Sequence, residues 1–215
     1  LCMGKYYHKM RSHYILWLLT LVPEGPKMKV VAFNGSPRRD GNTTILIKHV
    51  FGELEKQGIE TELLQLADKV IHGCIACEKC SENKDRRCAV NNDAANEYIE
   101  KMLGADGIIL GSPVYFQDVT SEMKALIDRT GYVSRANGRM FKKKVGASVV
   151  AVRRSGAIHT LDTMGHFFLS GEMVIVGRAI GVGRAKGEVE KDAEGMELVK
   201  SLGQRMAWVL GKLHG

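Results

Sequence analysis

The chain has 215 residues, of which 45% are hydrophobic and 26% charged, and its formal net charge is +7. This length and composition suit one globular domain with a substantial core. No nucleic-acid partner is expected, because the sequence has no zinc-finger pairing, no RNP-like aromatic motif and no long basic stripe.

Residues 1–27 differ in composition from the rest of the chain. They begin with Leu and carry the apolar stretch Tyr14–Val22 behind several basic residues. A membrane-spanning helix needs about 20 apolar residues, so no stable membrane insertion is expected. The stretch is similar to the middle of a signal peptide, but no A-x-A-like cleavage site accompanies it. Because Met28 directly precedes the first expected strand, we expect residues 1–27 to be an N-terminal extension, either a leader or a mis-assigned start. An interfacial anchor or an oligomer contact is the alternative.

From Met28 onward, short apolar runs alternate with amphipathic stretches. Short apolar runs predict buried strands, and apolar residues spaced three and four apart predict helices. The expected strands are residues 29–33, 61–66, 107–110, 145–152 and 173–176. The expected helices are residues 42–56, 93–103 with Asp93 as N-cap, 121–129, 157–169, and a last helix whose apolar stripe runs from Val199 to Leu213.

Five strands that alternate with helices predict an α/β fold with a parallel sheet covered on both faces. The run 145–152 is continuously apolar and rich in β-branched residues, so it is expected near the centre of the sheet. The architecture that fits is the flavodoxin-like doubly wound sheet with strand order 2-1-3-4-5. We expect residues 28–215 to form a single domain of this kind.

The segment after the first expected strand is rich in small, hydroxyl and turn-forming residues and leads into a helix. Free N–H groups at a helix N-terminus, together with hydroxyl side chains, form an anion site. The segment is neither a Walker A loop nor a G-x-G-x-x-G fingerprint. Phosphate binding is favoured over simple capping of the helix. The candidate donors are Ser36, Arg38, Asn42, Thr43 and Thr44.

Four cysteines fall within fifteen residues after the second expected strand, and the only other cysteine is Cys2. Their order is Cys74, Cys77, Cys80 and Cys88. A C-x2-C-x2-C run with a fourth cysteine shortly after suits an iron–sulfur cluster. Zinc sites more often pair two C-x2-C knuckles across a longer spacer. Zinc and free thiols remain the alternatives, as does a disulfide, although disulfides are rare in the intracellular setting that the rest of the chain suggests.

Two further loops are expected at the edge of the sheet where the carboxyl ends of the strands meet. The third strand leads into a segment against which an aromatic ring system could pack, namely Pro113, Val114, Tyr115 and Phe116. The alternative for its two aromatic residues is burial in the core under the loop. The fourth strand leads into Arg154 and Ser155, which offer donors and positive charge or are simply solvated. Three such loops predict a flavin site, since no carboxylate is placed to hold the magnesium of a nucleotide-triphosphate site.

Taken together, the loop Gly35–Thr43, the segments Ser112–Phe116 and Lys124–Arg129, and the cysteine spacing resemble the NADPH-dependent FMN reductase superfamily. They are most similar to its iron–sulfur flavoprotein branch, and the resemblance covers residues 28–215. It implies that the candidate donors of the first loop hold the FMN phosphate. It also implies that the segment from Pro113 to Phe116 lines the isoalloxazine ring.

The leading hypothesis is a redox enzyme that uses FMN and a 4Fe–4S cluster, with the cluster on the segment 74–88. The flavin would carry the chemistry, so no catalytic side chain is expected. The electron donor would be NAD(P)H or ferredoxin, and the acceptor a quinone, an oxygen species or a protein partner. Two alternatives are an NAD(P)H-dependent FMN or quinone reductase without a cluster, and a non-catalytic flavin electron carrier. A homodimer or homotetramer in the cytoplasm is expected.

Overall fold

The computed structural model describes residues 27–214, so the N-terminal extension expected over residues 1–27 lies outside the described residues, apart from Lys27. The elements in chain order are β1 (Lys29–Asn34), α2 (Asn42–Glu55), β2 (Glu60–Gln65), η1 (Leu66–Asp68), α3 (Lys79–Asn83), α4 (Ala95–Leu103), β3 (Gly107–Pro113), α5 (Ser121–Ala136), β4 (Val145–Val152), α6 (Ala157–Ser170), β5 (Val174–Val182), η2 (Glu188–Lys191) and α7 (Ala193–His214). None of the helices in this range is both long enough and apolar enough to cross a membrane.

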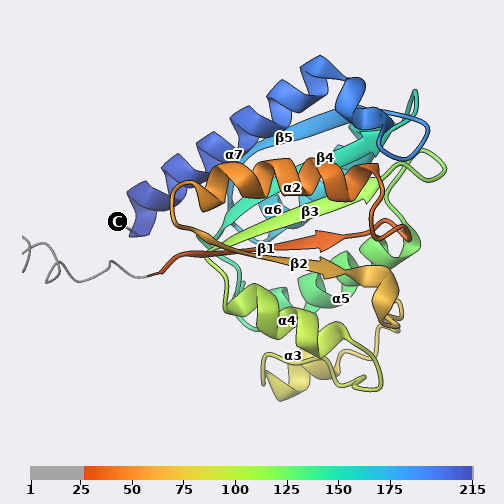
Figure 1. Cartoon of the computed structure of the whole chain (residues 1–215). Coiled ribbons are helices and arrows are strands. Elements are labelled where there is room, and N and C mark those ends of the chain that lie inside the picture. Colours follow the sequence, from red (N-terminus) through yellow and green to blue (C-terminus); the bar gives the residue numbers. More distant parts are fainter. Residues whose placement is uncertain (1–26, 215) are drawn as a thin grey trace, which may run out of the picture.

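The five strands form one parallel sheet in the order β2-β1-β3-β4-β5 (Figure 1). This confirms the predicted flavodoxin-like fold. Every residue of β4 is buried, as its continuous apolar sequence predicts. The chain winds from β1 to β2 on one side and then returns to place β3 on the other side of β1. The crevice for a ligand is therefore expected at the carboxyl ends of β1 and β3.

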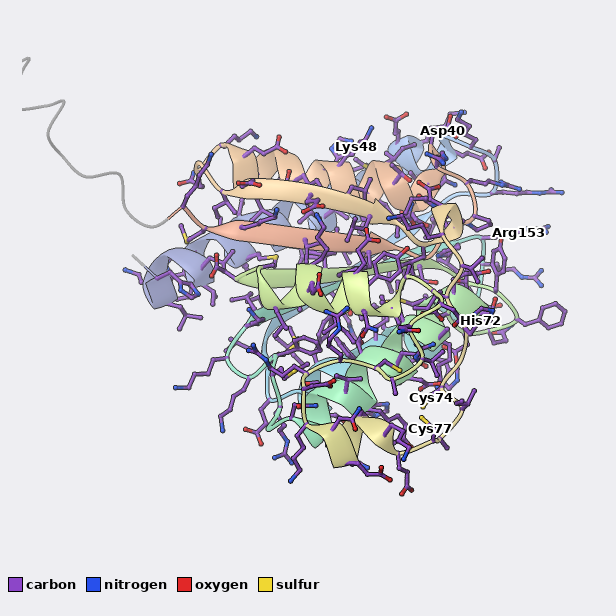
Figure 2. The ribbon with its side chains drawn as sticks, turned by 90° about the horizontal axis from the view of Figure 1, so that it is seen from below. Asp40, Lys48, His72, Cys74, Cys77 and Arg153 are labelled. Atoms are coloured by element: carbon purple, nitrogen blue, oxygen red, sulfur yellow. The ribbon has the colours of Figure 1, made fainter. Side chains whose placement is uncertain are left out.

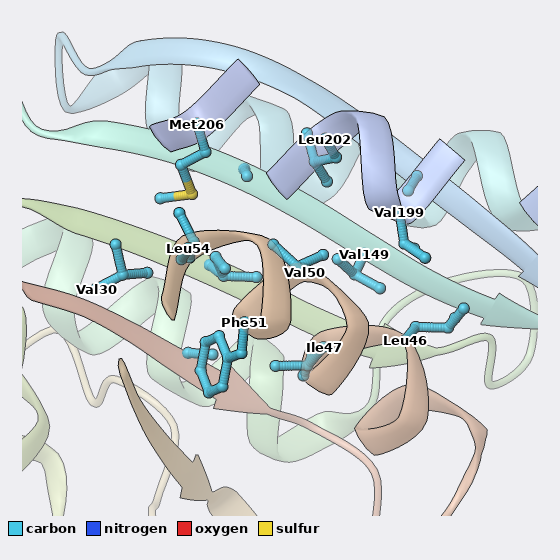
Figure 3. Packing of buried hydrophobic residues seen from close by; sticks show 14 of the residues in the cluster. Val30, Leu46, Ile47, Val50, Phe51, Leu54, Val149, Val199, Leu202 and Met206 are labelled. Atoms are coloured by element: carbon cyan, nitrogen blue, oxygen red, sulfur yellow. The ribbon is translucent and has the colours of Figure 1, made fainter. Parts of the chain in front are cut away.

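Two hydrophobic cores lie on opposite faces of the sheet, because successive residues of a strand point to opposite sides. Val30 of β1 packs in the core under α2 and α7, with Leu46 and Leu202 from these helices (Figure 3). The next residue, Val31, belongs to the core under α4, α5 and α6, together with Leu126. The sheet is thus covered on both faces, and the loops at its carboxyl edge are held by two rigid layers.

Two elements, β5 and α5, run at least six residues past the end that the sequence pattern indicates. β5 continues to Val182, although the pattern ends it at residue 176. Gly177 has φ +142 and the register with β4 shifts beside it, so a glycine-bearing irregularity interrupts the strand signal without ending the strand. Likewise α5 runs past residue 129 and through Gly131 to Ala136. Tertiary packing thus overrides the low intrinsic preference of glycine for both kinds of element.

The cysteine segment and the start of the next helix also differ slightly from expectation. The segment was expected to be irregular, but it contains the short helix α3. The following helix α4 starts at Ala95 with Ala94 as its N-cap. Asp93, the expected N-cap, therefore precedes the observed N-cap by one residue. Its carboxylate still accepts a hydrogen bond from the N–H of Ala95, at 3.1 Å.

Candidate functional site

The loop between β1 and α2 is fixed at its start by contacts to the loop after β3. The N–H of Gly35 donates to the carbonyl of Gly111 at 2.7 Å, and the hydroxyl of Thr120 donates to the carbonyl of Gly35 at 2.8 Å. A Cβ at Gly35 would lie only 2.9 Å from the Thr120 hydroxyl oxygen, so a side chain there would force the two loops apart. The two loops therefore form one unit at the carboxyl edge of the sheet.

The same loop ends at an uncapped helix N-terminus. Gly41, the N-cap of α2, has an extended backbone, and no side chain caps the helix. The N–H groups of the first turn of a helix have no partner within the helix, and they attract anions. Ser36 and Thr43 are buried beside this turn, and Arg38 is exposed at its rim. The hydroxyl of Ser36 accepts a hydrogen bond from the N–H of Arg38 at 3.1 Å. This arrangement can hold a phosphate.

Two of the five predicted phosphate donors use their side chains within the protein. The hydroxyl of Thr44 donates to the carbonyl of Arg39 at 2.7 Å and accepts from the amide of Asn34 at 2.8 Å. The side-chain amide of Asn42 donates to the carbonyl of Ala185 at 3.0 Å, and its oxygen accepts from a main-chain N–H in the segment after β5. These two side chains shape the loop, which leaves their main-chain N–H groups as the donors that they can offer to an anion.

The loop after β3 makes a strained two-residue turn. The N–H of Tyr115 donates to the carbonyl of Asp118 at 2.8 Å, and the reverse hydrogen bond is 3.1 Å. Between them, Phe116 and Gln117 have φ of 46° and 72°, the left-handed region that this type of hairpin turn requires and that Asn-Gly usually fills. Two bulky side chains here cost roughly 1–3 kcal/mol each, and such strain gathers at functional sites.

The aromatic residues of this turn are not core residues. Phe116 is fully exposed and Tyr115 is 48% exposed. The alternative that both are buried under the loop is therefore wrong. The proline before the turn, Pro113, is the last residue of β3, and Val114 is half-buried beside it. These residues leave an exposed apolar surface at the same sheet edge as the loop between β1 and α2.

The loop after β4 meets the strained turn. Gly156 has φ +91, and a Cβ there would come within 2.7 Å of the side chain of Val114, so only glycine fits. The amide of Gln117 lies 3.5 Å from the hydroxyl of Ser155. The side chains of Arg153 and Arg154 are exposed at this strand end. All three predicted loops thus meet at one edge of the sheet, and two exposed arginines add positive charge there.

The cysteine segment leaves the same edge of the sheet after β2. In Figure 2, Cys74, Cys77 and His72 lie at the same end of the molecule as Arg153. The carbonyl of Val70 accepts from the N–H of Ala94 at 3.0 Å, which closes the neck of the segment. The cysteine segment is therefore an insertion whose two ends lie close together at the edge of the domain.

The four cysteines are all free thiols and line one cavity of about 270 Å³. Four residues between Cys74 and Cys88 have positive φ, among them Ala76 and Glu78, and the resulting bends of the chain let the cysteines line one cavity. Cys74 and Cys77 are exposed, while Cys80 and Cys88 are half-buried. No disulfide links any of these four.

A buried arginine fixes the inner side of this cavity. Arg129 of α5 is 1% exposed and donates from Nε to the sulfur of Cys88 at 3.2 Å. Its other donors reach the carbonyls of His72 and Val90, at 3.0 and 2.8 Å, and the carboxylate of Asp93 at 2.8 and 3.3 Å. Burial alone would raise the pKa of Asp93, but hydrogen bonds from the His72 N–H and Arg129 outweigh it and lower this pKa below its usual value.

The residues present fit a cluster better than one ion. Among residues 27–214, no three Cys, His, Asp or Glu side chains converge as the ligands of a single ion would. The four thiolates of a cube-shaped cluster bind four different irons and surround a larger body. A 270 Å³ cavity lined by four free thiols and by the buried guanidinium of Arg129 provides such a space and ligand set.

Two structural features were missed by reasoning from the sequence. The role of Arg129 has a weak signal, an arginine on the apolar face of a helix, but its partners lie far away in the chain. A second cavity of about 430 Å³ lies between α5 and α6, away from the three loops, and is lined among others by Phe141, Phe167 and Ser134. The buried hydroxyl of Ser134 has no hydrogen-bond partner there.

Comparisons with known proteins agree with this geometry. The model of the NADPH-dependent FMN reductase family matches residues 28–187. An iron–sulfur flavoprotein of Methanocaldococcus jannaschii is 39% identical over 193 residues, which cover 85% of this chain and 97% of that protein. An iron–sulfur flavoprotein of Methanosarcina thermophila is 31% identical over 186 residues, which cover 85% of this chain and 95% of that protein.

Solved structures share the fold at low sequence identity. RosB with a bound 8-demethyl-8-formylriboflavin-5′-phosphate intermediate superimposes with a TM-score of 0.72 at 20% identity, covering 86% of this chain and 80% of that one. The NAD(P)H:quinone oxidoreductase of Methanothermobacter marburgensis superimposes with a TM-score of 0.68 at 15% identity, covering 84% and 96%. These likenesses agree with the sheet order, and the family match covers most of the described domain. The chain therefore belongs to the NADPH-dependent FMN reductase family.

Proposed function

We propose that this protein is a flavin-dependent oxidoreductase of the iron–sulfur flavoprotein type, which passes electrons between FMN and a 4Fe–4S cluster. The observation that carries the proposal is the convergence of four free cysteines on one cavity, at the sheet edge that also bears the three loops. The relatives named iron–sulfur flavoproteins, which this chain matches over most of their length, support it.

In this proposal the first loop binds the FMN phosphate. The main-chain N–H groups of the first turn of α2 supply most of the hydrogen bonds, with the buried hydroxyls of Ser36 and Thr43 and the charge of Arg38. Asn42 and Thr44 hold the loop in shape through their contacts within the protein. A phosphate at a helix N-terminus needs no further cation, so one arginine at the rim suffices.

The other two loops supply the residues that would bind the flavin ring. Pro113, Val114, Tyr115 and Phe116 would flank the isoalloxazine, and Arg154 and Ser155 would lie near its polar edge. The ligands of the cluster would be Cys74, Cys77, Cys80 and Cys88. When bound, the flavin supplies one- and two-electron chemistry and the cluster supplies single-electron chemistry. The protein orients both and excludes water from the phosphate and from the inner side of the cluster cavity.

The proposal identifies the redox partners only by their chemical class. NAD(P)H or ferredoxin would deliver electrons, and a quinone, an oxygen species or a protein would accept them. The exposed thiols of Cys74 and Cys77 lie on the side of the cavity that a protein partner can approach. We also infer a homodimer or homotetramer located in the cytoplasm.

Anaerobic purification followed by visible spectroscopy and by iron, sulfide and zinc analysis tests the proposal. We expect one FMN and about four irons and four sulfides per chain. A Cys77→Ser variant should keep FMN and lose iron. Protein that binds FMN but contains zinc, or no metal, after anaerobic reconstitution would refute the cluster part of the proposal.

A second candidate is an NAD(P)H-dependent FMN or quinone reductase without a cluster. The observation in its favour is that protein contacts alone hold the cysteine segment, through the Arg129–Asp93 pair and the Val70–Ala94 hydrogen bond. In this case Cys77→Ser and Cys80→Ser should leave turnover of NAD(P)H unchanged, measured with quinone as acceptor.

A further inference from the structure

Arg129 uses every donor that it has. A guanidinium carries five N–H groups. In this protein they reach the sulfur of Cys88, the carbonyls of His72 and Val90, and both carboxylate oxygens of Asp93. His72 precedes the first cysteine of the segment and Val90 follows the last one, so one side chain ties both ends of the segment to α5.

The contact to Cys88 differs from the others because its acceptor is a proposed cluster ligand. A hydrogen bond from a buried cation favours the more negatively charged form of its acceptor. Adding an electron to an iron–sulfur cluster increases the negative charge on its thiolates. Hydrogen bonds to the sulfurs are among the factors that set the reduction potential of such clusters.

We propose that Arg129 is a positioning residue of the metal site, which presents the Cys88 sulfur to the cluster and raises the reduction potential of the cluster. The inference rests on the proposed function, because it needs a cluster on the four cysteines. It goes further by assigning the control of the potential to one residue outside the ligand set. The paired carboxylate of Asp93 balances the charge of Arg129, so the effect comes from the hydrogen bond and not from net charge.

The chain offers a matched control for this inference. Arg135 lines the same cavity and also belongs to α5, but it is exposed and lies over the ring of Tyr132, with its guanidinium carbon 5.4 Å from the ring centre. An Arg135→Gln variant removes a positive charge beside the cavity without touching the buried contacts of Arg129. It separates a general charge effect from the directed hydrogen bond.

The variants must also separate the hydrogen bond from stability. A single Arg129→Gln change leaves the buried carboxylate of Asp93 without its partner, and such a protein can fail to fold. The double variant Arg129→Gln/Asp93→Asn removes both charges together and keeps the net charge unchanged. Arg129→Lys keeps the positive charge next to Asp93, but one ammonium group cannot replace the planar set of N–H donors of a guanidinium.

The experiment is a redox titration of the reconstituted protein, followed by EPR of the reduced cluster. We expect the double variant and Arg129→Lys to show a lower midpoint potential and altered g-values, and to retain severalfold less iron after gel filtration. Arg135→Gln should match the unmodified protein in all three. A folded Arg129→Lys or double variant with unchanged potential and spectrum overturns the inference, while an unmodified protein that binds no iron and sulfide overturns the proposed function as well.

Discussion

At the scale of single residues, the closeness of Gly35 to Thr120 gives a sharp prediction. Gly35→Ala places a methyl group 2.9 Å from the Thr120 hydroxyl oxygen and 3.1 Å from the Cβ of Met123, so the first loop must shift. We expect the affinity for FMN to fall by about tenfold or more, which corresponds to about 1.4 kcal/mol. Fluorescence titration of metal-free protein with FMN measures it.

A matched glycine provides the control for this prediction. Gly52 lies within α2, and a Cβ there would meet nothing within 4 Å. Gly52→Ala should leave FMN affinity unchanged and stabilise the protein by about 0.5–1 kcal/mol, since glycine is unfavourable within a helix. Equal FMN affinity in the two alanine variants would contradict the role of Gly35.

The buried pair Arg129–Asp93 predicts a pH dependence of stability. The pKa of Asp93 is lowered in the folded protein, so its stabilising effect is complete above its ordinary pKa of 3.8 and is lost as the pH falls below this value toward the folded pKa. Asp93→Asn leaves the buried guanidinium unpaired and should cost about 3–5 kcal/mol near neutral pH. We expect this difference in unfolding free energy to shrink as the pH falls below about 4. Urea unfolding of both metal-free proteins across this range checks it, and a constant difference would be inconsistent with an ionised pair.

Residue types and their order indicated which segments carry the candidate site, but not the contacts that their side chains make. Ser36 is buried in the loop before α2 and Thr43 at the start of α2, and the four cysteines line one cavity. The motifs gave no sign that Asn42 and Thr44 would turn their side chains inward. These partners come from segments far away in the chain, and a local pattern carries no information about them.

At the scale of elements, the strained turn after β3 predicts that a change which stabilises the folded protein will weaken FMN binding. Phe116→Asn/Gln117→Gly installs the pair that this turn type prefers and should stabilise the metal-free, FMN-free protein by about 1–2 kcal/mol. The same change removes the exposed aromatic ring beside the phosphate loop, so FMN affinity should fall. Urea unfolding and FMN titration measure the two effects.

A positive-φ residue away from the site serves as the control for the turn. Lys143 has φ 68 between α5 and β4 and lies outside the three loops. Lys143→Gly should stabilise the protein for the same backbone reason and leave FMN binding unchanged. If the turn variant binds FMN as tightly as the unmodified protein, the ring-flanking role of Phe116 fails.

The order and type of the strands and main helices could be predicted, but some of their ends could not. Apolar periodicity located all five strands because each contributes apolar side chains to one of the two cores or packs them against it. The far half of β5 was missed since Gly177 and the shifted register break the pattern of an edge strand. The last turns of α5 were missed because Gly131 lowers the local helix signal, while the helix is held by its packing.

At the scale of the whole molecule, the cysteine segment stands outside both hydrophobic cores. None of the four cysteines belongs to either core cluster, and a main-chain hydrogen bond closes the segment at its neck. A variant with all four cysteines changed to Ser should therefore unfold within about 1 kcal/mol of the metal-free unmodified protein. Chemical denaturation of both proteins without metal tests it. A much larger loss would mean that the segment is part of the folding unit.

Helix α5 connects the two parts of the proposed site. It begins at the Thr120 cap, which bonds the first loop, and Arg129 lies nine residues further on, roughly 14 Å along the axis at about 1.5 Å per residue. One helix thus fixes the loops at the carboxyl edge of the sheet relative to the cysteine cavity.

The closed neck between Val70 and Ala94 also bears on how such proteins diverge. A segment that enters and leaves the domain at nearly one point can change its length and composition by mutation while the sheet keeps its ancestral packing. Gain, loss or replacement of a metal centre then requires only local changes in the gene.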